Sequence, residues 1–179
     1  MSKARGAGRL RVRPELGAVD STKKANTMKQ RLNPLTLVPE GVNALINVEK
    51  YLENCGLDHK LLLLIKTRVS QMNGCAYCLH MHTKDARKLG ESEARLYLLD
   101  AWYESNLYSP RERAALAWAE SLTRIAATHA PDEDYEAVRQ QFSEKEIADL
   151  SIAIAMINAW NRLSIGARSV HPGDLARAA

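Results

Sequence analysis

The chain has 179 residues, a formal net charge of +4 and 46% hydrophobic residues. This length suits one domain with a sizeable core, and many Ala and Leu residues with a single Phe favour packed helices over a sandwich of short strands. No apolar run is long enough to span a bilayer, and the basic N-terminus lacks the apolar region of a secretory signal, so we expect no membrane partner. Three cysteines, an odd number, do not make a disulfide framework, and we expect a cytoplasmic protein.

The positive charge belongs to residues 1–27. This segment contains seven basic and two acidic residues, so the rest of the chain carries a net charge of −1. Its low apolar content predicts a disordered tail, followed by one helical domain at 28–179. The tail lacks the interleaved aromatic residues of a nucleic-acid binder, so we expect no nucleic-acid partner. An extended gene start, a segment that docks on acidic surfaces or a neighbouring subunit, and an organelle-targeting segment stay open as interpretations.

From residue 39 onward, the spacing of apolar residues predicts a series of helices and no strand. The predicted helices, in chain order, cover about 39–56, 58–72, 75–90, 92–103, 109–128, 131–141 and 143–165. We therefore expect an all-α bundle of about six to seven helices.

Several helix boundaries are marked by specific residues. Asp58 is a predicted N-cap, and Ser109 and Ser143 each precede a glutamate by three residues, which is the pattern of a capping box. Gly74 follows an Asn and predicts a break between two helices. The last helix is apolar nearly all round, so we expect it to be central or to lie at a subunit interface.

The segment 74–87, "GCAYCLHMHTKDAR", combines two cysteines and two histidines. On a helix that begins near Cys75, the side chains of Cys75, Cys78 and His82 lie along one face. Unpaired N–H groups at the helix start favour a thiolate, and cysteines at this spacing can form and break a disulfide. An imidazole one turn further on can accept a thiol proton. The pattern predicts a reversible dithiol with an adjacent base.

Two other interpretations of this segment are open. The cysteines could simply pack in the core as small apolar residues. A structural zinc site would need four ligands, of which Cys75, Cys78 and His82 supply three. His80 points to another side of the helix and is expected at the surface, and Cys55 could join only through folding. We therefore expect no metal.

Three stretches of the chain carry a resemblance to a known family. They are "LLLLIKTRVSQMNGCAYCLHMHTKDARKLGESEARLYLLDAWYES", "ERAALAWAESLT" and "INAWNRLSIGAR". Together they resemble the alkylhydroperoxidase D-like (AhpD-like) branch of the carboxymuconolactone decarboxylase family, over about residues 28–173. The resemblance implies an AhpD-like all-α fold, assembly into trimers or hexamers, and reduction of hydroperoxides with electrons from an external dithiol. It also implies that Cys78 attacks the peroxide, Cys75 resolves the intermediate, and His82 belongs to a proton relay.

Two positions differ from the family's best-known relay. The family has a glutamate twelve positions before the first cysteine and a histidine between the cysteines, where this chain has Leu63 and Tyr77. Glu104 and Glu120 are candidates for a replacement carboxylate, although a glutamate on a helix is more often a solvated residue than a relay member. Tyr77 could donate a hydrogen bond or serve only in packing.

The sequence thus predicts a thiol-dependent peroxidase that forms a sulfenic acid at Cys78 and then a Cys75–Cys78 disulfide. We expect no metal, haem or flavin cofactor. A non-catalytic redox-sensing or assembly protein is one alternative. Carboxymuconolactone decarboxylation is another, although that chemistry is not built on a cysteine pair.

Overall fold

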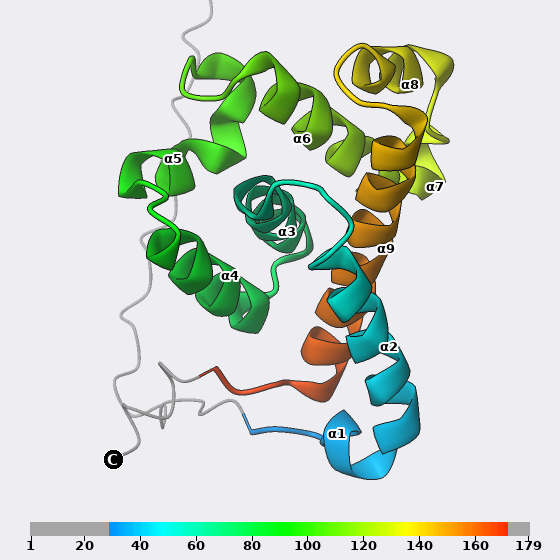
Figure 1. The fold of residues 1–179 in the computed structure, drawn as a ribbon. Helices are drawn as coiled ribbons and strands as arrows, with labels where there is room; N and C mark the ends of the chain where they lie inside the picture. Colours follow the sequence, from blue (N-terminus) through cyan, green and yellow to red (C-terminus); the bar gives the residue numbers. More distant parts are fainter. Residues whose placement is uncertain (1–28, 172–179) are drawn as a thin grey trace, which may run out of the picture.

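The computed structural model describes residues 29–171, and within this range the chain forms helices and turns without a strand (Figure 1). The helices are α1 (Pro34–Leu37), α2 (Pro39–Leu52), α3 (His59–Asn73), α4 (Ala76–Lys88), α5 (Glu93–Leu98), the 3-10 helix η1 (Leu99–Glu104), α6 (Pro110–Thr123), α7 (Ile125–Thr128), α8 (Asp132–Arg139) and α9 (Glu144–Ala167). The predicted all-α fold is confirmed. The predicted tail at 1–27 lies outside the described residues.

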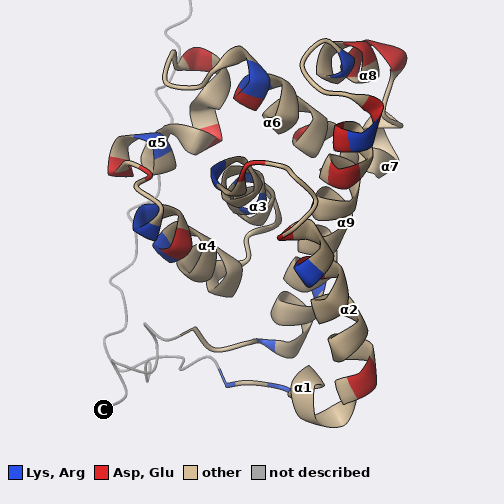
Figure 2. Cartoon of the chain, viewed as in Figure 1, with Lys and Arg blue, Asp and Glu red and all other residues tan. Residues whose placement is uncertain are grey.

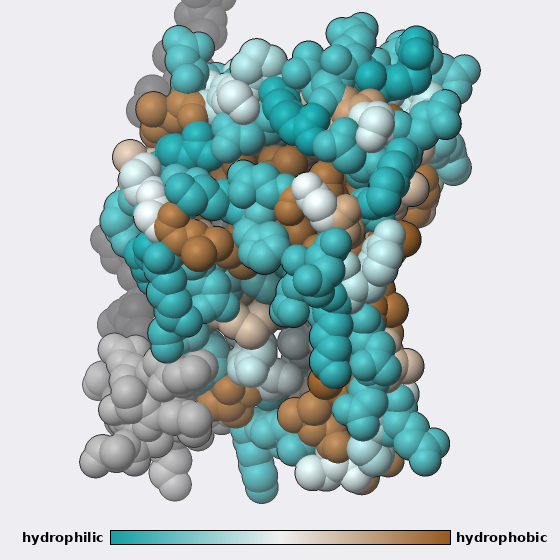
Figure 3. Space-filling view, in the orientation of Figure 1, coloured by the Kyte–Doolittle hydropathy of each residue, from teal (hydrophilic) through white to brown (hydrophobic). Residues whose placement is uncertain are grey.

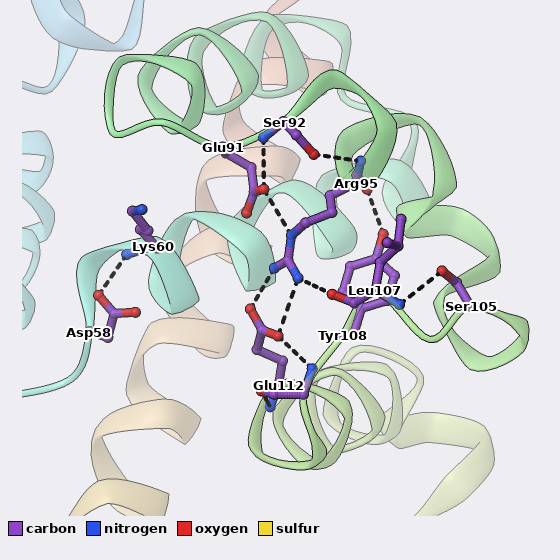
Figure 4. Close-up of polar contacts among 10 residues, drawn as sticks. Asp58, Lys60, Glu91, Ser92, Arg95, Ser105, Leu107, Tyr108 and Glu112 are labelled. Atoms are coloured by element: carbon purple, nitrogen blue, oxygen red, sulfur yellow. Dashed lines mark hydrogen bonds and ion pairs between the residues drawn. The ribbon is translucent and has the colours of Figure 1, made fainter.

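The predicted helix starts are formed by the expected capping residues. The Asp58 carboxylate accepts a hydrogen bond of 3.2 Å from the Lys60 backbone N–H at the start of α3 (Figure 4). Both capping boxes, at Ser109 and Ser143, are complete, with each glutamate side chain accepting from the serine N–H. These short-range bonds satisfy N–H groups that a helix leaves unpaired at its start, which is why the sequence marks them.

The prediction of one continuous helix over 109–128 is wrong, because the chain leaves the α-helix at Arg124 (φ −98°, ψ 28°). The Thr128 hydroxyl, in the short helix α7, donates a 2.7 Å hydrogen bond to the Ser121 carbonyl. This bond satisfies a carbonyl near the end of α6 that a continued helix would otherwise have used.

Two further elements differ from the predicted helices. The predicted helix over 92–103 is α5 followed by η1, with Ala101 outside helical geometry (φ −117°, ψ 31°). Helix α1 was not predicted, since four residues are too few to show an apolar period. It begins where the Asn33 side chain accepts a 3.1 Å hydrogen bond from the Leu35 N–H, with a proline at the first helical position.

Helix α3 lies at the centre of the bundle, with α4, α6 and α9 packed around it (Figure 1). Its buried residues are Leu61, Leu62, Leu64, Ile65, Thr67, Arg68, Val69 and Ser70. Each fully buried Leu or Ile side chain contributes roughly 1.5–3 kcal/mol of hydrophobic stabilisation. The polar members of this set need partners inside the protein, and these partners define the two sides of α3 described below.

Helix α9 is central, as predicted, and carries no charged residue between Asp149 and Arg162 (Figure 2). Its buried residues run along its length and include Leu150, Ile154 and Ile157. It also leaves apolar side chains exposed, at Ile152, Leu163 and Ile165. An all-round apolar helix therefore serves both the core and an open face of this chain.

Arg95 on α5 holds the connection to α6 in place (Figure 4). Its guanidinium binds the Glu91 carboxylate at 2.8 Å, the Glu112 carboxylate and the Leu107 carbonyl. The Tyr108 hydroxyl donates to the Arg95 carbonyl, and the guanidinium lies 4.9 Å from the centre of the Tyr108 ring. Because every group in this cluster has a partner, its role is structural.

The surface of the described residues is mixed in polarity. Lys, Arg, Asp and Glu are spread over the outer helices with both signs interspersed (Figure 2). Apolar residues appear between polar ones as separate patches (Figure 3). The patch at α1 contains Leu35, Leu37 and Val38, which are 61%, 65% and 57% exposed. None of the described helices is both long and apolar enough to cross a bilayer.

Candidate active site

The two motif cysteines lie at the start of α4. Gly74 adopts the left-handed conformation (φ 69°) that ends α3, which is favourable for a residue without a side chain. The turn makes Cys75 the N-cap of α4, and its Sγ accepts a 3.4 Å hydrogen bond from the Cys78 N–H. The predicted break and helix start therefore place both sulfurs at the end of a helix where N–H groups are unpaired.

Both thiols are free and each residue is only 1% exposed. Cys78 Sγ lies 3.9 Å from the Ser164 hydroxyl on α9. Cys78 also lines a cavity, whereas Cys75 is not among the residues that line it. A molecule in this cavity therefore meets Cys78 first, and Cys75 lies behind it.

The protonation of the two sulfurs is coupled. The hydrogen bond from the Cys78 thiol lowers the pKa of Cys75, helped by the Cys78 backbone N–H and opposed by burial. The same hydrogen bond, burial and the negative charge on Cys75 raise the pKa of Cys78. Because the Cys75 sulfur accepts the Cys78 N–H, the first negative charge of the pair is favoured at Cys75, and loss of the second proton is opposed.

A network of hydrogen-bonded amide side chains from α3 and α9 adjoins the cysteines. Asn161 on α9 is fully buried, and its side chain donates a 3.0 Å hydrogen bond to the Ser70 hydroxyl and accepts a 2.9 Å bond from Asn73. The Asn73 side chain also donates to the Asn158 side chain at 3.0 Å. Asn161 further lowers the pKa of Cys75, so the network both fixes α9 against α3 and stabilises the thiolate.

His82 follows Cys78 by one turn of α4 and lines the same cavity. It is 7% exposed, and its Nε2 atom has no hydrogen-bond partner among the described residues. Burial and then the charge of Lys66 lower the pKa of His82 to about 4. The imidazole is therefore neutral at physiological pH, with one buried nitrogen open to a ligand or a proton.

The cavity has a volume of about 530 Å³ and is formed by α2, α3, α4, α9 and the segments beside them. Its apolar walls include Val42, Tyr77, Met81, Trp160, Leu163 and Val170. A second cavity of about 230 Å³ shares Lys66, His82 and Met81 with the first. An apolar pocket of this size with a few polar groups suits a small organic molecule.

The candidate relay residues lie in different places. Tyr77 lines the cavity, but Glu104 and Glu120 line neither cavity described above. Glu120 accepts hydrogen bonds of 2.8 Å from both Arg68 and the Trp102 indole, and Glu104 is exposed at the end of η1. The structure therefore does not bring either glutamate to the cysteines.

An ion pair that we did not predict from the sequence lies in the cavity wall. Glu49 on α2 binds the Lys66 ammonium on α3 at 2.6 Å, and its other oxygen accepts a 2.9 Å hydrogen bond from the Trp160 indole on α9. A charged residue in the apolar run of α3 is a signal that could have singled out Lys66. Glu49 has no such signal, because only folding brings α2 beside α3 and α9.

Cys55 and His80 line neither of the two cavities. Cys55 is in the connection between α2 and α3, where its carbonyl accepts a 2.8 Å hydrogen bond from Lys145. His80 stacks on His171, with ring centres 5.5 Å apart. Within residues 29–171, no group of three or more His, Cys, Asp or Glu side chains is placed to hold a metal ion.

Comparisons with known proteins agree with this fold. Residues 37–121 match the carboxymuconolactone decarboxylase family. The chain is 47% identical over 138 residues to YdfG of Bacillus subtilis, an uncharacterized protein. The aligned residues cover 77% of this chain and 94% of YdfG.

Solved structures extend the comparison to three dimensions. A protein of unknown function from Agrobacterium tumefaciens, provisionally described as the antioxidant defence protein AhpD, is 44% identical with a TM-score of 0.78, covering 80% of this chain and 99% of that one. The debrominase Bmp8 shares the fold at 20% identity and a TM-score of 0.66, covering 76% and 73% of the two chains. This chain therefore belongs to the AhpD-like branch of the carboxymuconolactone decarboxylase family.

Proposed function

We propose that the protein is a thiol-dependent peroxidase that reduces hydroperoxides through a Cys75–Cys78 dithiol and disulfide cycle. One observation carries this proposal. Cys78 lines a cavity of about 530 Å³, while Cys75 does not line it and its sulfur accepts a hydrogen bond from the Cys78 N–H. One sulfur can thus meet a substrate while the other is held within the same turn of chain.

The first step oxidises Cys78. The Cys75 thiolate accepts the proton of the Cys78 thiol, and the Cys78 thiolate then attacks the terminal oxygen of the hydroperoxide. The sulfur–oxygen bond forms as the oxygen–oxygen bond breaks, and the leaving oxygen takes up a proton from water to become an alcohol. Cys78 is left as a sulfenic acid.

The second step closes the disulfide. Cys75 attacks the Cys78 sulfur, the sulfur–oxygen bond breaks, and the sulfenic oxygen leaves as water with the proton that Cys75 gives up, passed directly or through His82. An external dithiol, as the second partner of the enzyme, then reduces the disulfide by thiol exchange. No metal, haem or flavin takes part in these steps.

The proposed cycle also bears on the cellular location and the oligomeric state of the protein. A dithiol that must be reduced again in each turnover suits a reducing compartment, so we propose a cytoplasmic location. The exposed Ile152, Leu163 and Ile165 on α9 support self-association, and we propose a homo-oligomer, a trimer or hexamer.

Thiol counting tests the proposal. The reduced protein has three free thiols, and one equivalent of cumene hydroperoxide should leave one, with mass spectrometry locating a Cys75–Cys78 bond. If no disulfide forms, the peroxidase assignment is wrong. If the disulfide forms but turnover with any dithiol is negligible, and oxidation changes oligomer size or partner binding, the protein is a redox sensor instead.

A further inference from the structure

The Lys66 ammonium occupies a fixed position in the cavity wall. Its side chain is only 13% exposed and pairs with Glu49 at 2.6 Å. The second Glu49 oxygen is held by the Trp160 indole at 2.9 Å, so residues from α2, α3 and α9 together set the place of the charge. A long flexible side chain that is held this closely has lost the rotamer freedom that lysines normally keep.

One polar group beside Lys66 lacks a hydrogen-bond partner. His82 Nε2 is buried and has no hydrogen-bond partner among the described residues, and His82 lines both cavities together with Lys66. Buried polar atoms nearly always have partners in folded proteins, so an unpartnered nitrogen on a residue that lines two cavities indicates a role for that residue beyond packing. The cavity thus brings a thiol, an imidazole nitrogen and a cation to one space.

The proposed peroxidase step moves negative charge into this space. As the Cys78 sulfur bonds to the terminal oxygen, the electron pair of the breaking oxygen–oxygen bond goes to the leaving oxygen. That oxygen becomes an alkoxide until it takes a proton. Away from water such a charge is costly unless a fixed positive group lies nearby.

We propose that Lys66 is a further catalytic residue, whose ammonium stabilises the negative charge on the leaving oxygen, with Glu49 and Trp160 as positioning residues. This inference rests on the proposed peroxidase function. Neutral His82 complements Lys66, since its free nitrogen can hydrogen-bond the same oxygen. The other titratable residues that line the two cavities are Glu53, His59, Tyr77 and Asp85. Of these, Glu53 and His59 are exposed, so water screens their charges more than that of Lys66.

Variants of Lys66 test the inference in a single-turnover reaction. The rate of Cys78 oxidation by cumene hydroperoxide should fall by about a hundredfold in Lys66→Met, as for other lost oxyanion donors. Lys66→Arg should recover a large part of the rate because it restores the charge. The matched control is Lys60→Met, an exposed lysine on the same helix, which should react at the wild-type rate.

A second readout does not depend on peroxide. Nuclear magnetic resonance titration should show the pKa of His82 raised in Lys66→Met, because the charge of Lys66 helps to lower it, and unchanged in Lys60→Met. If Lys66→Met does not fold, Glu49→Gln serves instead, because it frees the ammonium to move. Glu49→Gln should lower the turnover number more than it changes the KM for the hydroperoxide, and its oxidation rate should fall about tenfold.

The outcomes separate the inference from the proposed function. If Cys78 in Lys66→Met is oxidised within twofold of the wild-type rate, the role of Lys66 is overturned and the proposed function is not. The same holds for Glu49→Gln if Lys66→Met does not fold. A wild-type protein that no hydroperoxide oxidises at Cys78 would overturn both. A hundredfold loss with recovery by arginine, in a protein whose His82 titration shifts as expected, supports both.

Discussion

Lys66 and Arg68 are two buried cations on the same helix with different surroundings. They are two positions apart on α3, so their side chains point to nearly opposite sides of the helix. Arg68 faces Glu120, Asp100 and Gln71, and the Trp102 indole completes the bonding of Glu120. Lys66 faces a cavity in which a nearby imidazole nitrogen is unpartnered.

The difference shows how a structural cluster can be told from a chemical one. Around Arg68, each charged group is bonded to other protein groups, which leaves nothing for a substrate to bind. Around Lys66, the protein satisfies the ion pair, but Cys78 and His82 line a cavity and one buried nitrogen of His82 has no partner among the described residues. Satisfied polar networks add rigidity, whereas unsatisfied groups beside a cavity indicate function.

The largest expected effect is a loss of peroxidase activity, on the side of α3 where Lys66 faces the cavity. Cys78→Ser should abolish hydroperoxide consumption, because the only sulfur of the pair that lines the cavity is lost. Cys55→Ser is the matched control and should consume hydroperoxide at the wild-type rate, since Cys55 lies in the connection between α2 and α3. Peroxide consumption in the presence of excess dithiol measures both. Equal rates for the two variants would contradict the account.

On the Arg68 side, the expected effect is on stability rather than activity. Glu120→Ala leaves the buried Arg68 with only the exposed carboxylate of Asp100 as an ion-pair partner and should lower the free energy of unfolding by about 3 kcal/mol. Urea unfolding measures this change. Activity per folded molecule should stay at the wild-type level. The exposed Glu104, changed to Ala, is the control and should alter stability by less than about 0.5 kcal/mol.

The pH dependence of stability should report His82. Burial and the Lys66 charge lower its pKa from 6.5 to about 4, so the unfolded chain binds the extra proton more readily between these values. The free energy of unfolding should therefore fall by about 2 kcal/mol as the pH drops from 6.5 to 4. His82→Gln should remove this part of the slope in urea unfolding series, while His59→Gln should retain it. A slope that is the same in all three proteins would contradict the burial of His82 as a neutral group.

The smallest expected effect comes from Leu63→Glu. Leu63 lines the second cavity with Lys66 and His82, so a carboxylate here would lie close to both. It should raise the pKa of His82 and increase the peroxidase rate severalfold, provided that the lack of a carboxylate at this position limits the rate. Steady-state kinetics with Leu63→Gln as the uncharged control measure the effect. A rate that does not rise would show that the Glu49–Lys66 pair already supplies what the reaction needs.

Short-range patterns in the sequence predicted much of the fold. Asp58, Ser109 and Ser143 marked helix starts because each caps its own helix within three residues. Gly74 marked the turn that places Cys75 at the start of α4. The end of α6 at Arg124 was missed, since the hydrogen bond between Thr128 and Ser121 competes with helix continuation in a way that apolar spacing does not show.

The candidate site was predictable only where its residues are neighbours in sequence. Cys75 and Cys78 lie at the start of α4 and His82 one turn further along the same helix, so local spacing alone places the three on one element. Glu49 and Trp160 reach the site from α2 and α9, and only the packing of these helices on α3 shows that they meet. Glu120 was a candidate carboxylate by residue type, but its helix turns it toward Arg68.

The most direct measurement is the location of the first oxidised sulfur. In Cys75→Ser, the protein cannot close the disulfide, so one equivalent of cumene hydroperoxide should leave a sulfenic acid that dimedone traps. Peptide mass spectrometry should place the dimedone adduct on Cys78, with Cys55 unmodified. An adduct on Cys55 instead, or no adduct while peroxide is still consumed at the wild-type rate, would contradict a reaction that begins at Cys78.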